Sequence, residues 1–358
     1  KMKIFIKIII FFYTTFIFNI PNLHTLEKIK IVLLVHMTVK DSQIGKSIVK
    51  AIRLAVNKID NSSIEIVPKD TKSNPEITLK SAKELNNEGI KIVIGPVFNK
   101  NLIHLKEIND MIFLSLTNKI INNSNNIISA GINSTSQFNT ISKFQKINNL
   151  KKTIILIPKE NYKEEIEEGI KHSKIQSKRI YYYDSEPTKL TKQIEKITKY
   201  KIRKNNLKRE INKLENSNEA NKERKIENLK KRDTIGNISF DSVIVSDFDE
   251  SLKSIITSLL YTDVSPENIY FLTLNQWFDE SLLKEKSFQP IYFPSINKEN
   301  YNTFVNNYYE IFNEYPNQLS FLSYDLVGLV YYLIVKNNFV VDQKMFLKKN
   351  MFKGKIGI

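Results

Sequence analysis

Two short apolar runs, each followed at once by turn-forming or polar residues, most constrain the fold of this chain. Residues 90–94 and 111–114 have the pattern of strands that are buried on both faces of a parallel sheet. The residues that follow these two runs include Gly95, Pro96, Ser115, Thr117 and Asn118. Because open α/β sheets bind ligands at the carboxyl ends of their strands, we expect these residues to lie beside a binding crevice.

Strand and helix patterns alternate from residue 29 onward. The expected strands cover residues 29–35 and 64–67, and the expected helices cover residues 44–59 and 77–85. A chain that alternates in this way builds a parallel sheet with right-handed crossovers and helices on its faces. The pattern therefore predicts an α/β fold.

The composition limits the chemistry that the chain can perform. Its 358 residues, 41% of them apolar, are enough for two packed domains. There is no cysteine, which excludes a disulfide framework, a thiol nucleophile and a Cys-based metal site. The four histidines are scattered without the spacing of metal ligands, so we expect neither zinc nor another cofactor. Lysine is abundant throughout, so part of the net charge of +16 needs no functional explanation.

The first 22 residues predict an export signal or a membrane anchor. Three lysines within the first seven positions precede or interrupt an apolar run over residues 4–20, which is the order of a secretory signal. Its part after Lys7, residues 8–20, is short for a membrane-spanning helix, but no small-residue cleavage site follows it. A cleaved signal and an uncleaved anchor are therefore alternatives, and both indicate export to the periplasm.

Residues 189–233 interrupt the alternation of strands and helices. They hold sixteen Lys and Arg and seven Asp and Glu, and so carry +9 of the net charge. The positions that recur every three or four residues, as in a coiled-coil-like helix, are Leu190, Ile194, Ile197, Tyr200, Lys204, Leu207, Ile211 and Leu214. A turn at residues 215–218 and a shorter return helix would complete a charged helical hairpin over residues 190–233. This hairpin is either a docking element or a solvated spacer. It lacks the aromatic residues interleaved with basic ones, and the zinc or helix-turn-helix pattern, that are expected of a nucleic-acid binder.

The order and spacing of these motifs resemble the type I periplasmic binding proteins, and among them the leucine/isoleucine/valine-binding group. The matching residues are 29–34, Gly45, Asp70, Pro75 and 87–96. The resemblance implies two Rossmann-like α/β lobes with parallel sheets, joined by crossing strands, with the ligand between them. It implies the following boundaries: 28–130 and 291–338 for lobe one, 131–290 and 341–358 for lobe two, and 190–233 for a hairpin inserted in lobe two.

The resemblance also implies a ligand site on the facing edges of the lobes. In amino-acid binders of this family, a Ser and a Thr of lobe one and an acid of lobe two hold the ligand. Thr117 matches the Thr, whereas Asn99 stands near the position of the Ser and departs from the pattern. The candidate ligand-binding residues are Asn99, Ser115, Thr117, Asn118, Asp247 and Tyr324. The competing interpretation is that Ser115, Thr117 and Asn118 cap strand and helix ends, and that Asp247 is a solvated strand end.

The hairpin, followed by residues 233–236, resembles the penicillin-binding-protein activators, a bacterial branch of the family with an inserted charged helical segment. This implies a periplasmic regulator that contacts a cell-wall synthase or another envelope protein. The candidate partner-binding residues are Arg203, Lys204, Lys208 and Arg209.

Besides a regulator, the sequence must be compared with a solute-binding protein and with an enzyme. The alternative is a solute-binding protein of an ABC transporter, with branched-chain amino acids or short peptides as ligands. An enzyme fits poorly, because the sequence shows no nucleophile–base pair, phosphate loop or metal cluster. We expect no nucleic-acid partner, and contact with the membrane only through an uncleaved N-terminal segment.

Overall fold

A computed structural model describes most of the chain between residues 28 and 355. The residues in this span that it leaves out are 39–41, 60–63, 120, 122–123, 161, 276–281, 283, 347 and 349–351. The expected signal or anchor at residues 1–22 lies outside the described residues. Within the described part, no helix has both the length and the apolar character needed to cross a membrane.

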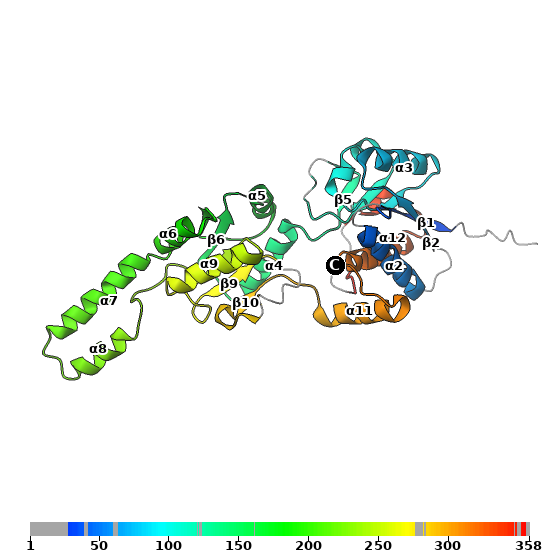
Figure 1. Ribbon diagram of the computed structural model, residues 1–358. Coiled ribbons are helices and arrows are strands. Elements are labelled where there is room, and N and C mark those ends of the chain that lie inside the picture. Colours follow the sequence, from blue (N-terminus) through cyan, green and yellow to red (C-terminus); the bar gives the residue numbers. More distant parts are fainter. Residues whose placement is uncertain are drawn as a thin grey trace, which may run out of the picture.

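Two five-stranded sheets, each entirely parallel, form the centres of two α/β lobes (Figure 1). The sheet of lobe one has the order β2-β1-β3-β4-β5, with β1 at Ile29–Val35, β2 at Ile64–Asp70, β3 at Ile92–Ile94, β4 at Ile112–Ser115 and β5 at Ile127–Ser129. The sheet of lobe two has the order β10-β9-β8-β6-β7, with β6 at Thr153–Pro158, β7 at Arg179–Tyr183, β8 at Ser242–Val245, β9 at Tyr270–Thr273 and β10 at Ile291–Tyr292. This arrangement confirms the predicted fold class, including the pairing of β3 with β4.

Both faces of each sheet are buried, which explains why the strands have continuous apolar sequences. In β1, Ile31 and Leu33 face one core of lobe one, whereas Val32 and Leu34 face the core on the other side. Successive side chains point to opposite faces of a strand, so a strand with helices on both sides needs apolar residues at every position. Strand β6 of lobe two, which lies between β8 and β7, repeats this pattern between the two cores of that lobe.

Helices from two distant parts of the chain complete lobe one. Its helical elements are α2 (Ser42–Ile59), α3 (Pro75–Asn87), the 3-10 turns η1 (Asn99–Leu102) and η2 (Leu105–Glu107), α11 (Lys298–Phe312) and α12 (Ser320–Lys336). The sequence predicts one helical segment where η1 and η2 lie. Helix α3 begins at Pro75, two residues before the expected start, because the side chain of Asn74 accepts the backbone N–H groups of Glu76 (2.8 Å) and Ile77 (3.0 Å).

Lobe two carries the inserted helical segment. Its helices are α4 (Ser134–Ile147), α5 (Lys163–His172), α6 (Pro187–Ile197), α7 (Tyr200–Glu215), α8 (Lys222–Lys230) and α9 (Asp249–Tyr261), and η3 (Lys286–Phe288) is a short turn. Helices α7 and α8 pack against each other and extend away from lobe two on the side far from lobe one (Figure 1).

The projecting hairpin is shorter than the sequence predicts. Leu190 and Ile194 of α6 are buried in the core of lobe two, where α6 packs against α9, so this helix belongs to the lobe. The chain breaks at Lys199, which adopts a left-handed conformation (φ 54°) between α6 and α7. The expected continuous seam is therefore divided, and the hairpin begins at Tyr200 rather than at residue 190.

The C-terminal segment lies on lobe one, which differs from the expected boundary at residue 341. Met345, in the 3-10 turn η4 (Gln343–Phe346), is buried in a core of lobe one. The ring of Phe352 packs beside Tyr332 of α12, and the side chain of Asn300 donates to the carbonyl of Lys355 at 2.6 Å. Helices α11 and α12 belong to lobe one and present an apolar surface. The described part of the C-terminal segment covers this surface.

Candidate functional site

Loops from both lobes enclose a cavity of about 510 Å³. Such a volume is within the range of roughly 300–1,000 Å³ that small-molecule sites occupy. Its lining comes from the loops after β3 and β4, the start of α12, the crossing to α4, and the loops after β8 and β9. The lining residues are Val97, Phe98, Asn99, Leu116, Thr117, Asn118, Lys119, Ile132, Gln137, Phe248, Asn275, Gln318, Leu319 and Leu322. The cavity therefore lies at the facing carboxyl edges of the two sheets, where the sequence predicts it.

Three of the six candidate ligand-binding residues line this cavity: Asn99, Thr117 and Asn118. Thr117 is buried, and its position is set by its neighbours. Its backbone N–H donates to the Ser115 hydroxyl at 3.3 Å, and its own hydroxyl accepts the backbone N–H of Lys119 at 3.2 Å. The crossing chain passes so close that a Cβ atom on Gly131 would lie 2.2 Å from the Thr117 carbonyl oxygen. Only glycine fits there.

Ser115 and Tyr324 are not among the residues that line the cavity. Ser115 is fully buried, and its hydroxyl donates to the carbonyl of Pro96 at 2.7 Å, which ties β4 to the turn after β3. Tyr324 is buried in a core of lobe one, with its ring edge-on to Phe304 at a centroid distance of 5.3 Å. Both side chains support the loops and helices around the site from within the lobe.

Asp247 follows β8 but is only 6% exposed and does not line the cavity. Its carboxylate accepts the Tyr183 hydroxyl at 2.5 Å and the backbone N–H of Phe248 at 2.9 Å. Burial raises the pKa of Asp247 more than these hydrogen bonds lower it. The same environment, chiefly burial, raises the pKa of the Tyr183 phenol. Phe248, the next residue, lines the cavity instead of Asp247. Its ring packs edge-on against the ring of Tyr162, with 5.3 Å between the two centroids.

Several lining residues were missed by the sequence analysis, among them Gln137, Asn275 and Gln318. The side-chain oxygen of Gln137 on α4 accepts the backbone N–H of Asn275 at 2.7 Å, which joins α4 to the loop after β9. Asn275 follows a buried strand just as Asn118 does, so the same rule would have found it. Gln137 lies within a helix and has no comparable signal in the sequence.

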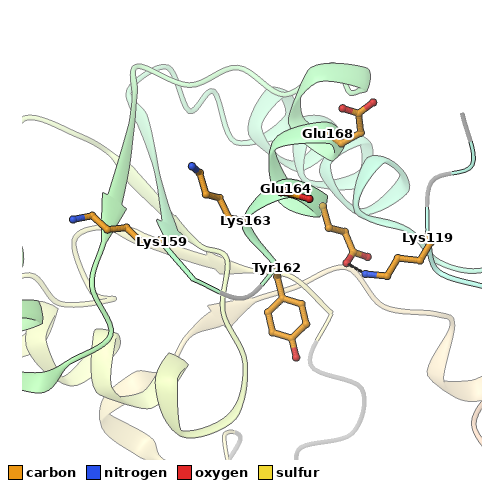
Figure 2. Close-up of a pocket in the computed structure, with 7 residues that line it drawn as sticks. Lys119, Lys159, Tyr162, Lys163, Glu164 and Glu168 are labelled. Atoms are coloured by element: carbon orange, nitrogen blue, oxygen red, sulfur yellow. Dashed lines mark hydrogen bonds and ion pairs between the residues drawn. The ribbon is translucent and has the colours of Figure 1, made fainter.

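A second cavity of about 920 Å³ lies at the rim of the cleft and shares Lys119 with the first. Figure 2 shows its charged lining, drawn largely from α5 and the loop before it. The Lys119 ammonium of lobe one pairs with the Glu165 carboxylate of α5, and this ion pair bridges the two lobes (Figure 2). In the described part of the chain, no group of three or more His, Cys, Asp or Glu could hold a metal ion.

The four candidate partner-binding residues occupy two different environments on α7. Lys204, Lys208 and Arg209 are exposed. Arg203 is only 4% exposed and lies at the base of the hairpin. Its guanidinium donates to the carbonyl of Thr198 (3.0 Å), the hydroxyl of Thr234 (2.9 Å) and the carbonyl of Thr262. It therefore joins the hairpin to the turn between α9 and β9.

No protein-family model matches the chain, and no curated protein matches its sequence. A putative branched-chain amino acid ABC transporter protein from Rhodospirillum rubrum has a similar structure, with a TM-score of 0.62 and 9% identity over 89% of this chain and 87% of the other. A branched-chain amino acid ABC transporter periplasmic ligand-binding protein from Burkholderia xenovorans gives a TM-score of 0.58 and 11% identity, covering 92% and 84%. The C-domain of LpoA from Haemophilus influenzae, a regulator of PBP1A, gives a TM-score of 0.57 and 15% identity, covering 86% of each chain.

These identities establish likeness of fold and leave the choice between a binding and a regulatory protein open. Two parallel five-stranded sheets, each flanked by helices, hold the cavity between them, and the likeness to these solved structures extends over at least 86% of the chain. The chain has the two-lobed α/β fold of the type I periplasmic binding proteins.

Proposed function

We propose that the protein is an exported regulator in the bacterial periplasm, which docks on a synthase of the peptidoglycan machinery through the α7–α8 hairpin. The observation that carries this proposal is the hairpin itself, a charged arm at the end of lobe two that lies away from the cleft (Figure 1). The likeness in fold to the LpoA C-domain, a regulator of PBP1A, is consistent with such a role.

The charge of the hairpin suits an acidic docking surface. Residues 200–232 contain twelve Lys and Arg and five Asp and Glu, a formal net charge of +7. Helix α8 has no buried residue, and Lys204, Lys208 and Arg209 of α7 are exposed. A concentrated charge of one sign speeds the encounter with a partner of the opposite sign. We infer that the partner's docking surface is acidic.

The attachment of the hairpin favours docking over a flexible spacer. Arg203 is buried between the hairpin and the α9–β9 turn. The backbone N–H of Ile235, in the segment that follows α8, donates to the Arg203 carbonyl at 3.2 Å. Both ends of the hairpin are thus tied to one point of lobe two. An arm held in one orientation loses less conformational freedom when it binds, which benefits affinity.

The second candidate is a solute-binding protein that delivers an amino acid or short peptide to an ABC transporter. The observation in its favour is the cavity between the lobes, with Thr117 in its lining. Against it stands the environment of Asp247, whose carboxylate is bound by Tyr183 rather than directed at a ligand. A transporter partner would contact the rims of both lobes, and the hairpin would contribute little.

Charge reversal on the hairpin distinguishes the two candidates. The test variant changes Lys204, Lys208 and Arg209 to Glu and keeps Arg203. The matched control changes three exposed lysines of lobe one, Lys80, Lys83 and Lys91, to Glu. Each protein is used to capture partners from an envelope extract, which are identified by mass spectrometry.

We expect wild type and the control to capture a peptidoglycan synthase and the hairpin variant to lose it. Circular dichroism must show that all three proteins are folded. Capture of the same synthase by the hairpin variant at the same salt concentration would contradict docking through the hairpin. Capture of transporter subunits by all three proteins would favour the second candidate.

A further inference from the structure

The hairpin leaves lobe two at the junction of α6 and α7 (Figure 1), and a groove of about 820 Å³ lies there. One wall of the groove is a single face of α6, because Thr188, Thr191 and Glu195 recur every three or four residues along the helix. Ile202 of α7, beyond the break at Lys199, lines the other side. The opposite face of α6 is buried in the core of lobe two. The groove therefore lies on the outer face of α6 and shares no described lining residue with the cavity between the lobes.

The rim of this groove is basic. Its charged residues are four exposed lysines, Lys192, Lys196, Lys199 and Lys201, and one acid, Glu195. The Lys201 ammonium lies 3.8 Å from the Glu195 carboxylate. Among the described residues, no acidic side chain lies within ion-pair distance of the other three lysines. The groove therefore presents three cations to a partner.

A neighbouring cavity of about 570 Å³ extends the basic surface and shares Lys196 and Lys199 with the groove. It adds Lys178 and Arg179, and its described lining contains no acid. The Lys178 ammonium donates to the carbonyl of Ser239 at 2.6 Å, which holds this side chain against the lobe. The basic surface thus continues from α6 to β7, the strand at the edge of the sheet. An occupant of the groove would meet positive charge along its length.

The groove also offers an apolar contact. Ile202 is 59% exposed, which is a large exposed area for an isoleucine on an otherwise charged helix. The hydrocarbon stems of the surrounding lysines extend this apolar surface while their ammonium groups stay in water. The wall from residue 188 to residue 199 is about 16 Å long at 1.5 Å per residue, which is the length of about three helical turns. An amphipathic helix that places an apolar side chain in a groove is a common form of peptide recognition.

We propose that this groove binds an acidic amphipathic helix of the docking partner, with its acids against the lysines of α6 and an apolar side chain against Ile202. That the helix belongs to the captured synthase rests on the proposed function, whereas the chemistry of the occupant follows from the groove itself. A second copy of this chain suits the groove less well. Its most acidic described helix, α5, buries its apolar residue Ile166 in lobe two and would offer acids without an apolar face.

Fluorescence anisotropy on the full chain tests the proposal with a labelled synthetic peptide of about four helical turns. The peptide has leucine at every third or fourth position and glutamate and alanine elsewhere. The comparison peptide has the same composition in scrambled order, so that it has the same charge without an apolar face. We expect the amphipathic peptide to bind more tightly. Equal binding of the two peptides would mean attraction by charge alone and would overturn the proposal.

Charge reversal assigns the binding to the groove. The variant Lys192→Glu, Lys196→Glu should bind the acidic peptide about tenfold or more weakly, because like charges then face each other. It should bind a peptide with lysine in place of glutamate more tightly than wild type does. The matched control, Lys80→Glu, Lys83→Glu on an exposed side of α3, should behave as wild type does with both peptides. Equal affinities of variant and control would overturn the proposal.

A single substitution tests the apolar contact. Ile202→Ser should weaken binding of the amphipathic peptide by about fivefold or more, because an exposed apolar side chain that becomes covered contributes to binding. Ile147→Ser, at an 82% exposed position of α4, is the matched control and should bind as wild type does. Equal affinities of these two variants would contradict the contact with Ile202.

Two other occupants would be recognised in the same set of proteins. Wild type that binds phosphatidylglycerol vesicles but not the peptide, with vesicle binding lost on reversal of Lys192 and Lys196, would identify a membrane surface and overturn the proposal. A dimer in analytical ultracentrifugation that is lost on the same reversal would identify a second copy and overturn it as well.

Capture from envelope extract separates this inference from the docking function. If reversal of Lys192 and Lys196 removes both the peptide and the synthase, both proposals are supported. Synthase capture that survives this reversal but is lost on reversal of Lys204, Lys208 and Arg209 would contradict the groove and leave docking through the hairpin in place. Peptide binding that depends on the groove, with no synthase captured by wild type, would support the groove and contradict the docking function alone.

Discussion

Lobe two holds a buried charged side chain at each of its two ends, and the two have different surroundings. Arg203, at the base of the hairpin, donates to acceptors on three separate segments of chain. Asp247, near the cleft, accepts one hydroxyl from β7 and the N–H of the next residue. Both charges connect parts of the protein instead of facing a partner. The comparison teaches that the groups available for recognition are their neighbours: the exposed Lys204 at one end and the half-buried Phe248, which lines the cavity, at the other.

Deletions should give the largest contrast between the hairpin and the lobe that supports it. Removing residues 187–232 takes Leu190 and Ile194 out of the core of lobe two, where each truncation to Ala alone costs about 2–5 kcal/mol. We expect the cooperative thermal transition of this variant to be lost. Replacing only residues 208–228 with a short Gly-Ser turn keeps Arg203 and should leave the melting temperature close to that of wild type. Loss of the transition in the shortened protein as well would show that the outer hairpin stabilises the lobe.

Two adjacent residues of α7 should differ in their effect on stability. Arg203→Ala removes hydrogen bonds from a buried charged donor, and we expect it to lower the free energy of unfolding by about 1.5–3 kcal/mol. Lys204→Ala, at an exposed position, is the matched control and should change it by no more than about 0.5 kcal/mol. Urea denaturation measures both values. Equal effects would mean that burial does not separate the two side chains.

Docking through the hairpin should weaken as salt is added. The Debye length falls from about 10 Å at 0.1 M to about 3 Å at 1 M ionic strength, so attraction between exposed charges is screened. We expect affinity for the captured partner to drop at least tenfold over this range, about 1.4 kcal/mol. Surface plasmon resonance at a series of salt concentrations provides the measurement. The lobe-one control, with Lys80, Lys83 and Lys91 changed to Glu, should show the same drop as wild type. An affinity that does not change with salt would contradict docking through exposed charges.

The smallest expected effect is a pH dependence at the cleft end of lobe two. Burial raises the pKa of Asp247 above its ordinary value of 3.8. Folding therefore favours its protonated form, so this contribution to stability is full below about pH 3.8 and is lost as the pH rises through the raised folded value. Asp247→Asn should lessen the decline in the urea midpoint over that window. An unchanged slope would contradict this expectation.

The hairpin end should show no such response. Burial lowers the pKa of Arg203, but the guanidinium remains protonated at every pH at which the protein is studied. The Asp263 carboxylate lies 3.7 Å from this guanidinium, so the comparison is made where carboxylates are ionised. The Arg203→Ala variant should lose the same free energy of unfolding at about pH 6 and at about pH 8. A loss that changed strongly between these two pH values would show that a titrating neighbour, and not the guanidinium alone, determines the stability of this end.

Local sequence patterns were sufficient to predict the first four strands of lobe one. The apolar runs at β1, β3 and β4 predict buried parallel strands, because a strand covered on both faces needs apolar side chains at successive positions. The residues that follow β3 and β4 were expected at the cleft because open α/β sheets bind ligands at the carboxyl ends of their strands, and Thr117 and Asn118 do line the cavity. These predictions depend only on neighbours along the chain.

The tertiary structure decided which polar side chains are buried and which remain exposed. Arg203 and Lys204 are adjacent cations in one helix, yet only Arg203 is buried. Its guanidinium donates to the carbonyl of Thr262, which lies 59 residues away in sequence. Asp247 is withdrawn from the cavity by Tyr183, which lies 64 residues away. The periodicity of a helix or the end of a strand gives no information about such distant partners. The sequence alone therefore determined the two lobes and the place of the cleft, whereas only the folded chain decided which charges are available for binding.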